Sequence, residues 1–165
     1  MKTCALGLSG LLMLAATIPI PKRPVLIWNA SQSVPIGLYL IVPRSLHVGN
    51  FVVVRLSETM QALAEQRQYI GPDTPLLKRV AAMNGDTVCR HKSIVVINHR
   101  HIVIAFTSDH RARPLPAWRG CRRLTGGQVF VLGTHPESFD SRYFGPLAGE
   151  QVVGPAVSLL TLSSP

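Results

Sequence analysis

Acidic residues are scarce in this chain of 165 residues, which has 8 Asp and Glu against 17 Lys and Arg. Charged residues of both signs make up only 15% of the sequence and apolar residues 47%, a balance that argues against extensive disorder. The sequence also has no repeat and no low-complexity segment. We therefore expect one domain with a substantial core.

Aromatic residues are few as well, and the most basic segment, residues 90–123, holds only Phe106 and Trp118. They are too sparse for the stacking platform with which proteins bind single-stranded nucleic acid. The segment nevertheless carries eight Lys and Arg residues against one acid, Asp109. Two interpretations stay open, a basic surface that binds DNA or anionic lipid and an ordinary solvated face.

Charge is absent from residues 3–20. A helix of about 18 residues spans roughly 27 Å, close to the thickness of the hydrocarbon core of a bilayer. Basic residues flank the run on both sides, so the positive-inside rule does not orient it. Residues 1–23 are expected to form an apolar helix, either a membrane anchor or a cleavable export signal, and residues 24–165 to be exported.

Cysteine is rare, with three in the chain, and only Cys89 and Cys121 fall in the part expected to be exported. A pair in an oxidising compartment predicts one disulfide, worth roughly 3–4 kcal/mol. Two free buried thiols are the alternative. No spacing of Cys and His matches a zinc site, so we expect neither a metal nor a cofactor.

Proline and glycine, at 13 each, favour strands and turns over long helices. One helix is expected, because Ser57 suits the N-cap, Glu58 suits the first turn, and Gly71 with Pro72 would close the element. Apolar or β-branched runs predict strands at residues 38–42, 51–54, 76–82, 87–90, 93–97, 101–104, 128–132 and 156–162. The fold is therefore predicted to be mainly β.

Residues 29–39 place two serines, Ser31 and Ser33, directly before Pro35 and Gly37. Pro35 fixes a backbone angle and Gly37 tolerates unusual ones, so this turn can hold a serine rigidly. A rigid serine with backbone N–H groups turned towards one point is what an acyl-transfer nucleophile needs. The same residue types also make ordinary turns, which the local pattern alone favours.

Lys78 lies among apolar residues and, on a strand, shares a face with Leu76 and Val80. One interpretation is a surface lysine whose ammonium group snorkels to water. The other is the base of a Ser/Lys dyad, which must be neutral. Its pKa of ~10.4 would then have to fall by desolvation, helped by a cation such as Arg79.

A polar loop at residues 133–145 contains Ser138, Asp140 and Arg142. The Ser138 hydroxyl could aim a neutral amine, because an amine has a lone pair whereas an ammonium group only donates. Asp140 and Arg142 are expected to be a structural pair, since an ionised carboxylate beside the lysine would raise the lysine pKa.

Four segments, in this order, resemble the boxes of type I signal peptidases. They are Ser-Val-Pro-Ile-Gly at 33–37, Gly-Asn-Phe-Val-Val-Val at 49–54, Lys-Arg-Val-Ala-Ala-Met-Asn-Gly-Asp at 78–86 and Ser-Phe-Asp-Ser-Arg-Tyr-Phe-Gly at 138–145. The pattern Asn-x-Ser-x-Ser-x-Pro-x-Gly-Leu-Tyr resembles the TraF branch, the maturation peptidases of conjugative transfer systems. The likeness spans about residues 29–154.

The resemblance implies that Ser33 is the nucleophile and Lys78 the general base of a serine endopeptidase. The Ser31 hydroxyl and the Ser33 N–H would form the oxyanion hole. The supporting residues would be Ser138, which orients the lysine, and the pair Asp140 and Arg142.

The resemblance also implies a signal-peptidase-like (LexA-like) antiparallel β core with a smaller inserted β subdomain, at about residues 90–123. The substrates would be exported precursors, above all a conjugative prepilin. They would be cleaved by an enzyme associated with the inner membrane, its catalytic domain in the periplasm. Nucleic acid is not an expected partner.

Two departures from the cellular leader peptidases favour a dedicated substrate. Those enzymes carry Ser-Met-x-Pro, whereas here Pro35 comes two residues after Ser33, and residues 133–136 replace their Gly-Asp-Asn. The same residues support either hydrolysis or a transpeptidation that cyclises a pilin. A non-enzymatic basic module that binds DNA or anionic lipid is the alternative function.

Overall fold

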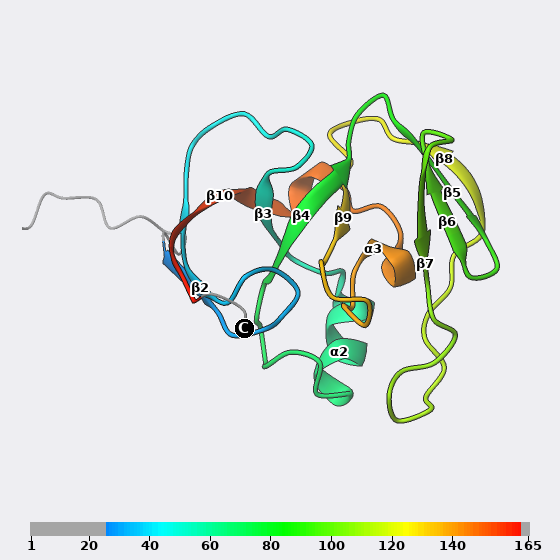
Figure 1. Cartoon of the computed structure of the whole chain (residues 1–165), viewed down its shortest axis with the longest axis horizontal. Helices are drawn as coiled ribbons and strands as arrows, with labels where there is room; N and C mark the ends of the chain where they lie inside the picture. The colour runs from blue at the N-terminus through cyan, green and yellow to red at the C-terminus, as the bar shows by residue number, and fades with distance from the viewer. Residues whose placement is uncertain (1–25, 163–165) are drawn as a thin grey trace, which may run out of the picture.

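The computed structural model describes residues 26–162 (Figure 1). The apolar helix predicted within residues 1–23 lies outside the described residues. Among residues 26–162, no helix is long and apolar enough to span a bilayer. The membrane anchor or export signal therefore stays a prediction.

Two antiparallel sheets make up most of the structure, which confirms the mainly β prediction. The larger sheet has the order β1-β2-β10-β3-β4-β9 and the smaller one β7-β6-β5-β8. The larger sheet contains β1 (Leu26–Asn29), β2 (Gly37–Ile41), β3 (Phe51–Val54), β4 (Leu76–Ala82), β9 (Phe130–Leu132) and β10 (Val152–Thr161). The smaller sheet contains β5 (Thr87–His91), β6 (Ile94–Ile97), β7 (His101–Ile104) and β8 (Gly120–Arg123).

The four-stranded sheet is inserted between β4 and β9 and lies at one end of the molecule, on the right in Figure 1. It begins at Thr87 and ends at Arg123, and so includes residues 90–123. The sequence does not predict β8, because all four residues of this strand are exposed and no apolar alternation marks them.

Within the part of the chain that the structure describes, three helical segments join the strands. α2 (Glu58–Gln66) begins directly after Ser57, although the Ser57 side chain makes no capping hydrogen bond. The predicted end at Gly71 is wrong, because Gln68 already adopts a left-handed conformation with φ of 61°. The short helix α3 (Ser141–Phe144) and the 3-10 turn η1 (Gly149–Gln151) lie between β9 and β10.

Strands β3 and β4 are neighbours in the interior of the six-stranded sheet and contribute to a core on each of its faces. Val52 and Val54 belong to the larger core, which includes residues of α2 and the four-stranded sheet. Val53 and Leu77 face the other way and pack with the buried Tyr39 of β2. A polar residue on β4 is therefore held between apolar layers.

Candidate active site

Strand β4 places Lys78 in the interior of the protein. Lys78 pairs in register with Val52 of β3 and shares a face of the strand with Leu76 and Val80. It is only 3% exposed. The snorkelling surface lysine is therefore wrong, because the side chain is buried instead of extending to the protein surface.

Two serine side chains from distant parts of the chain meet the amine of Lys78. Lys78 Nζ donates to Ser33 Oγ at 2.6 Å and to Ser138 Oγ at 2.7 Å. Ser138 Oγ donates to Ser33 Oγ at 2.9 Å. Ser33 lies in the loop between β1 and β2, and Ser138 lies between β9 and α3. The fold thus assembles a closed triangle of hydrogen bonds around the serine hydroxyl.

The loop that carries Ser138 is docked directly on the loop that carries Ser33. Thr134 N donates to the Ser33 carbonyl at 2.7 Å, and Thr134 Oγ1 donates to the same oxygen at 3.2 Å. Gly133 allows this approach, since a Cβ there would lie 2.0 Å from Ser138 Oγ. Sequence reasoning did not single out Gly133 and Thr134, because neither contact has a local signature.

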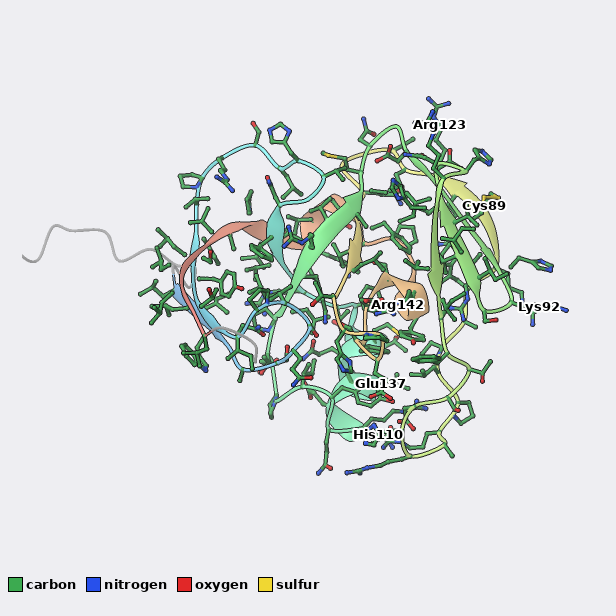
Figure 2. All side chains as sticks on the ribbon, viewed as in Figure 1. Cys89, Lys92, His110, Arg123, Glu137 and Arg142 are labelled. Atoms are coloured by element: carbon green, nitrogen blue, oxygen red, sulfur yellow. A yellow bond between two sulfur atoms is a disulfide. The ribbon has the colours of Figure 1, made fainter. Side chains whose placement is uncertain are left out.

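Asp140 and Arg142 form a buried pair behind Ser138. Arg142 Nη2 and Nε donate to the Asp140 carboxylate at 2.7 and 2.9 Å, and Asp140 also accepts from Gly133 N at 2.8 Å. Arg142 donates further to the carbonyls of Pro136 and His135. In Figure 2, Arg142 is labelled on α3, inside the outline of the molecule. The pair therefore fixes residues 133–142 by joining both ends of the segment.

Burial lowers the pKa of the Lys78 ammonium from its ordinary value of 10.5 to about 8. The negative charge of Asp140 acts in the opposite direction, and the positive charge of Arg142 lowers the pKa again. A lysine with this pKa is neutral in a substantial fraction of molecules under mildly alkaline conditions. It can then accept a proton from a serine hydroxyl.

Arg79 does not serve as the cation expected beside the lysine. It points to the other face of β4, where its guanidinium stacks 4.4 Å from the centroid of the Phe51 ring and donates to the Gly49 carbonyl at 2.8 Å. Neighbours along a strand face opposite sides of the sheet, which explains the correction. Arg142 provides the positive charge instead.

Ser31, the other serine of the turn, makes no contact with Lys78 in this structure. Its hydroxyl donates to Asn29 Oδ1 at 3.0 Å. Asn29 is itself buried, at 7% exposure. The sequence pattern includes Asn29 but gives no reason to assign it a contact with the serine loop.

The other predicted site residues lie apart from this cluster, in the four-stranded sheet. Cys89 of β5 and Cys121 of β8 are joined by a disulfide with an S–S distance of 2.00 Å. Arg90, one of the eight basic residues of this region, is buried and donates to the carbonyl of Arg142. The basic segment is therefore not uniformly a solvated surface.

A cavity of about 740 Å³ opens beside Ser33, Lys78 and Ser138. Residues 27–33 line this cavity, and so do Phe106 and His110 from the loop after β7. This volume lies within the range of about 300–1,000 Å³ that is typical of ligand-binding pockets. Within residues 26–162, no group of three or more His, Cys, Asp or Glu side chains is arranged to hold a metal ion.

Two proteins of plasmid transfer are similar to this chain over most of its length. The plasmid transfer protein TraF of Escherichia coli is 28% identical over 166 residues, which cover 92% of this chain and 90% of that protein. A probable conjugal transfer protein TraF of Sinorhizobium fredii is 32% identical over 143 residues, which cover 81% of this chain and 76% of that protein.

A solved signal peptidase I of Enterococcus faecalis is 18% identical to this chain. The match covers 68% of this chain and 97% of the solved one, with a TM-score of 0.38, which is too low to support an argument. The family model for signal peptidase, peptidase S26, matches residues 2–161. The chain therefore belongs to the signal peptidase family S26, in its TraF branch.

Proposed function

We propose that the chain is an endopeptidase with a Ser33–Lys78 dyad that processes an exported precursor, with a conjugative prepilin as the substrate. The observation that carries this proposal is the buried triangle of Ser33, Lys78 and Ser138 beside an open cavity. The plasmid-transfer function named for the TraF relatives supports the choice of substrate.

In the proposed reaction, Ser33 Oγ attacks the carbonyl carbon of the scissile peptide bond. Neutral Lys78 accepts the serine proton and passes it to the leaving amine as the C–N bond breaks. The Ser33 N–H and the Ser31 hydroxyl donate to the oxyanion, an interaction worth a few kcal/mol of the barrier. Water then loses a proton to Lys78 and attacks the acyl-enzyme, which releases the new carboxylate and regenerates Ser33.

Variants of the dyad test the proposal directly. Ser33→Ala and Lys78→Ala are each expected to lower cleavage of a coexpressed prepilin by about 10³-fold or more. Ser45→Ala and Lys92→Gln are matched controls, because both residues are exposed and neither side chain contacts the dyad. Processing that persists in either dyad variant would exclude this assignment.

The pH dependence of the rate provides a second test. The reaction needs neutral Lys78, whose pKa is about 8. We therefore expect kcat/KM to increase with pH and to level off above about 8. A rate that is flat from pH 6 to pH 9 would contradict the role of Lys78 as base.

The mass of the mature substrate distinguishes hydrolysis from cyclisation. Hydrolysis yields a linear product, whereas attack on the acyl-enzyme by an amine of the pilin yields a product lighter by one water. We propose hydrolysis as the basic activity, because water reaches the dyad through the open cavity. If the product is cyclic, the same dyad acts, and the amine of the pilin replaces water in the second step.

Membrane association is part of the proposal, with the catalytic domain in the periplasm. The Cys89–Cys121 disulfide supports an oxidising compartment. Trp28 of β1 and Leu160 of β10 both pair with Leu38 of β2 and so share one face of the sheet. They are 55% and 59% exposed, and Leu26, on the same face, is 53% exposed. An apolar face that includes β1, the strand that follows the apolar N-terminal run in sequence, supports contact with a bilayer.

Quenching of tryptophan fluorescence by brominated lipid tests this contact. The full chain in vesicles should show quenching of Trp28, while the buried Trp118 stays unquenched. Trp28→Phe is expected to remove the quenching. Equal emission with brominated and ordinary lipid would overturn the proposed contact and leave the dyad untouched.

A further inference from the structure

The buried side chain of Asn29 holds the loop that carries Ser33. Asn29 lies at the end of β1, before the loop. Its Nδ2 donates to the carbonyls of Ser31 at 2.8 Å, Val34 at 3.0 Å and Pro35 at 3.1 Å. These three carbonyls lie on both sides of Ser33. One amide group therefore ties the loop together across its most reactive residue.

The other half of the Asn29 amide binds the beginning of the loop. Asn29 Oδ1 accepts from Ser31 N at 3.2 Å and from Ser31 Oγ at 3.0 Å. A side-chain amide has two N–H donors and one carbonyl with two lone pairs, so the three carbonyls share two N–H groups and both lone pairs of Oδ1 are used. Among the other residue types only glutamine carries this group, on a side chain longer by one methylene.

Apolar packing does not replace these hydrogen bonds in the first half of the loop. Ala30, Ser31 and Gln32 are exposed, whereas Val34 is 1% exposed. Beyond Asn29, the Ser33 backbone is held by the Thr134 contacts to its carbonyl. The position of the Ser33 backbone thus depends on the contacts of Asn29 and Thr134, while Lys78 and Ser138 bind its hydroxyl.

We propose that Asn29 is a positioning residue that sets the geometry of the nucleophile loop and keeps the Ser31 hydroxyl in a resting orientation. This inference rests on the proposed peptidase function. In the free protein, the Ser31 hydroxyl donates to Asn29 Oδ1. When the oxyanion forms, the hydroxyl turns to donate to it, while Ser31 N stays bound to Asn29 Oδ1. The asparagine holds the backbone in place during this rotation.

Asn29→Asp is the sharpest variant, because it has nearly the same shape but lacks both N–H donors. Its carboxylate would face three carbonyl oxygens, which repel it. We expect kcat on a prepilin peptide to fall about 100-fold, the loss typical of a misplacement of about 1 Å. The KM should change less than about threefold, because aspartate keeps the shape of the cavity wall at residue 29. In Asn29→Ala, which adds no charge, the pH at which kcat/KM levels off should not move.

Asn50→Asp is the matched control. The Asn50 side chain makes one acceptor contact, from His47 N at 3.1 Å, which an aspartate preserves. Wild-type kcat is expected for this variant. Asn29→Ala removes the contacts without adding a charge and keeps the test valid if the aspartate variant fails to fold.

Two further measurements separate positioning from general stability. The effect of Asn29→Ala on kcat should be smaller in a Ser31→Ala background, because part of it acts through the Ser31 hydroxyl. Amides of residues 31–36 should exchange at least tenfold faster in Asn29→Ala, while the amides of β3 keep their protection. The inference would be overturned by a wild-type kcat in Asn29→Ala. It would also be overturned if the effects of Asn29→Ala and Ser31→Ala on kcat simply multiplied, or if amide exchange in the loop were unchanged. The exchange result does not need a substrate, so it tests Asn29 even if no prepilin is cleaved.

Discussion

The surroundings of the dyad and the outer edge of the four-stranded sheet differ in the exposure of their charged residues. Around the dyad, Lys78, Asp140 and Arg142 are 3%, 0% and 6% exposed. On the four-stranded sheet, Lys92 and Arg123 lie along the outer edge of the molecule (Figure 2). Among the described residues, no buried side-chain nitrogen or oxygen lacks a hydrogen-bond partner. Buried charges carry a large desolvation cost, so their placement indicates a functional site. The exposed charges account for most of the charged residues but do not indicate a function.

Breaking the buried pair should have the largest effect on stability. Asp140→Asn leaves the Arg142 guanidinium buried without a counter-charge, and we expect the free energy of unfolding to fall by about 3–5 kcal/mol. Chemical denaturation monitored by tryptophan fluorescence measures this loss. Asp86→Asn is the control, because Asp86 is more exposed and only accepts from Met83 N and Asn98 Nδ2. A loss from Asp140→Asn no larger than that of the control would refute the assignment of the pair to structure.

Removal of the disulfide tests whether the four-stranded sheet has its own stability. Cys89 and Cys121 are 32 residues apart in sequence, and the double variant to serine should lose roughly 3–4 kcal/mol by the chain-entropy model. The loss should appear as faster amide exchange in β5 to β8, with protection retained in β3 and β4. If β4 lost its protection to the same extent, the two sheets would unfold as one unit.

Lys78→Met should have a moderate effect on the free energy of unfolding, and in the opposite direction, because it should stabilise the protein. Because the folded pKa of about 8 lies below 10.5, the unfolded chain binds more protons between these pH values. The cost of burying the ammonium is therefore fully present below pH 8 and is lost as the pH rises to 10.5. It amounts to roughly 3 kcal/mol, at about 1.4 kcal/mol for each pH unit.

Hydrogen bonds lost to Ser33 and Ser138 offset part of that cost. We expect Lys78→Met to be inactive but about 1–3 kcal/mol more stable than the wild type at pH 6.5. The difference should fall by roughly 3 kcal/mol between pH 6.5 and pH 10.5, where only the loss of these hydrogen bonds remains. Denaturation at both pH values measures it, and a Met variant that is less stable at pH 6.5 would show that the lysine is not strained by burial.

Much of the fold was predictable because strands such as β3 and β6 are short apolar runs with clear ends. Strands β1 and β8 were not predicted, since β1 adjoins the serine turn and β8 consists of exposed residues. The family resemblance identified Ser33, Lys78 and Ser138 as site residues, and the structure brings them together.

The supporting contacts were not predictable from the sequence. The Thr134 contact to Ser33 joins residues 101 positions apart, and the Asn29 contacts depend on how the loop folds back. Arg79 was mistaken for the cation near Lys78 because adjacency in sequence does not mean adjacency in space on a strand. Non-local geometry has no signature in a single sequence.

The smallest effects are expected from the exposed basic residues of β8. Arg122→Gln with Arg123→Gln should change the free energy of unfolding by at most about 0.5 kcal/mol, because both residues are exposed. Prepilin cleavage should stay within about twofold of the wild type.

The same variant tests the alternative of a DNA-binding module. The affinity of such a module for DNA would fall steeply as the salt concentration rises, and this dependence on salt would become weaker as arginines are removed. DNA binding with this salt dependence, in a protein whose Ser33 and Lys78 variants keep their function, would favour the alternative. Cleavage that requires Ser33 and does not depend on salt would place the function at the buried dyad.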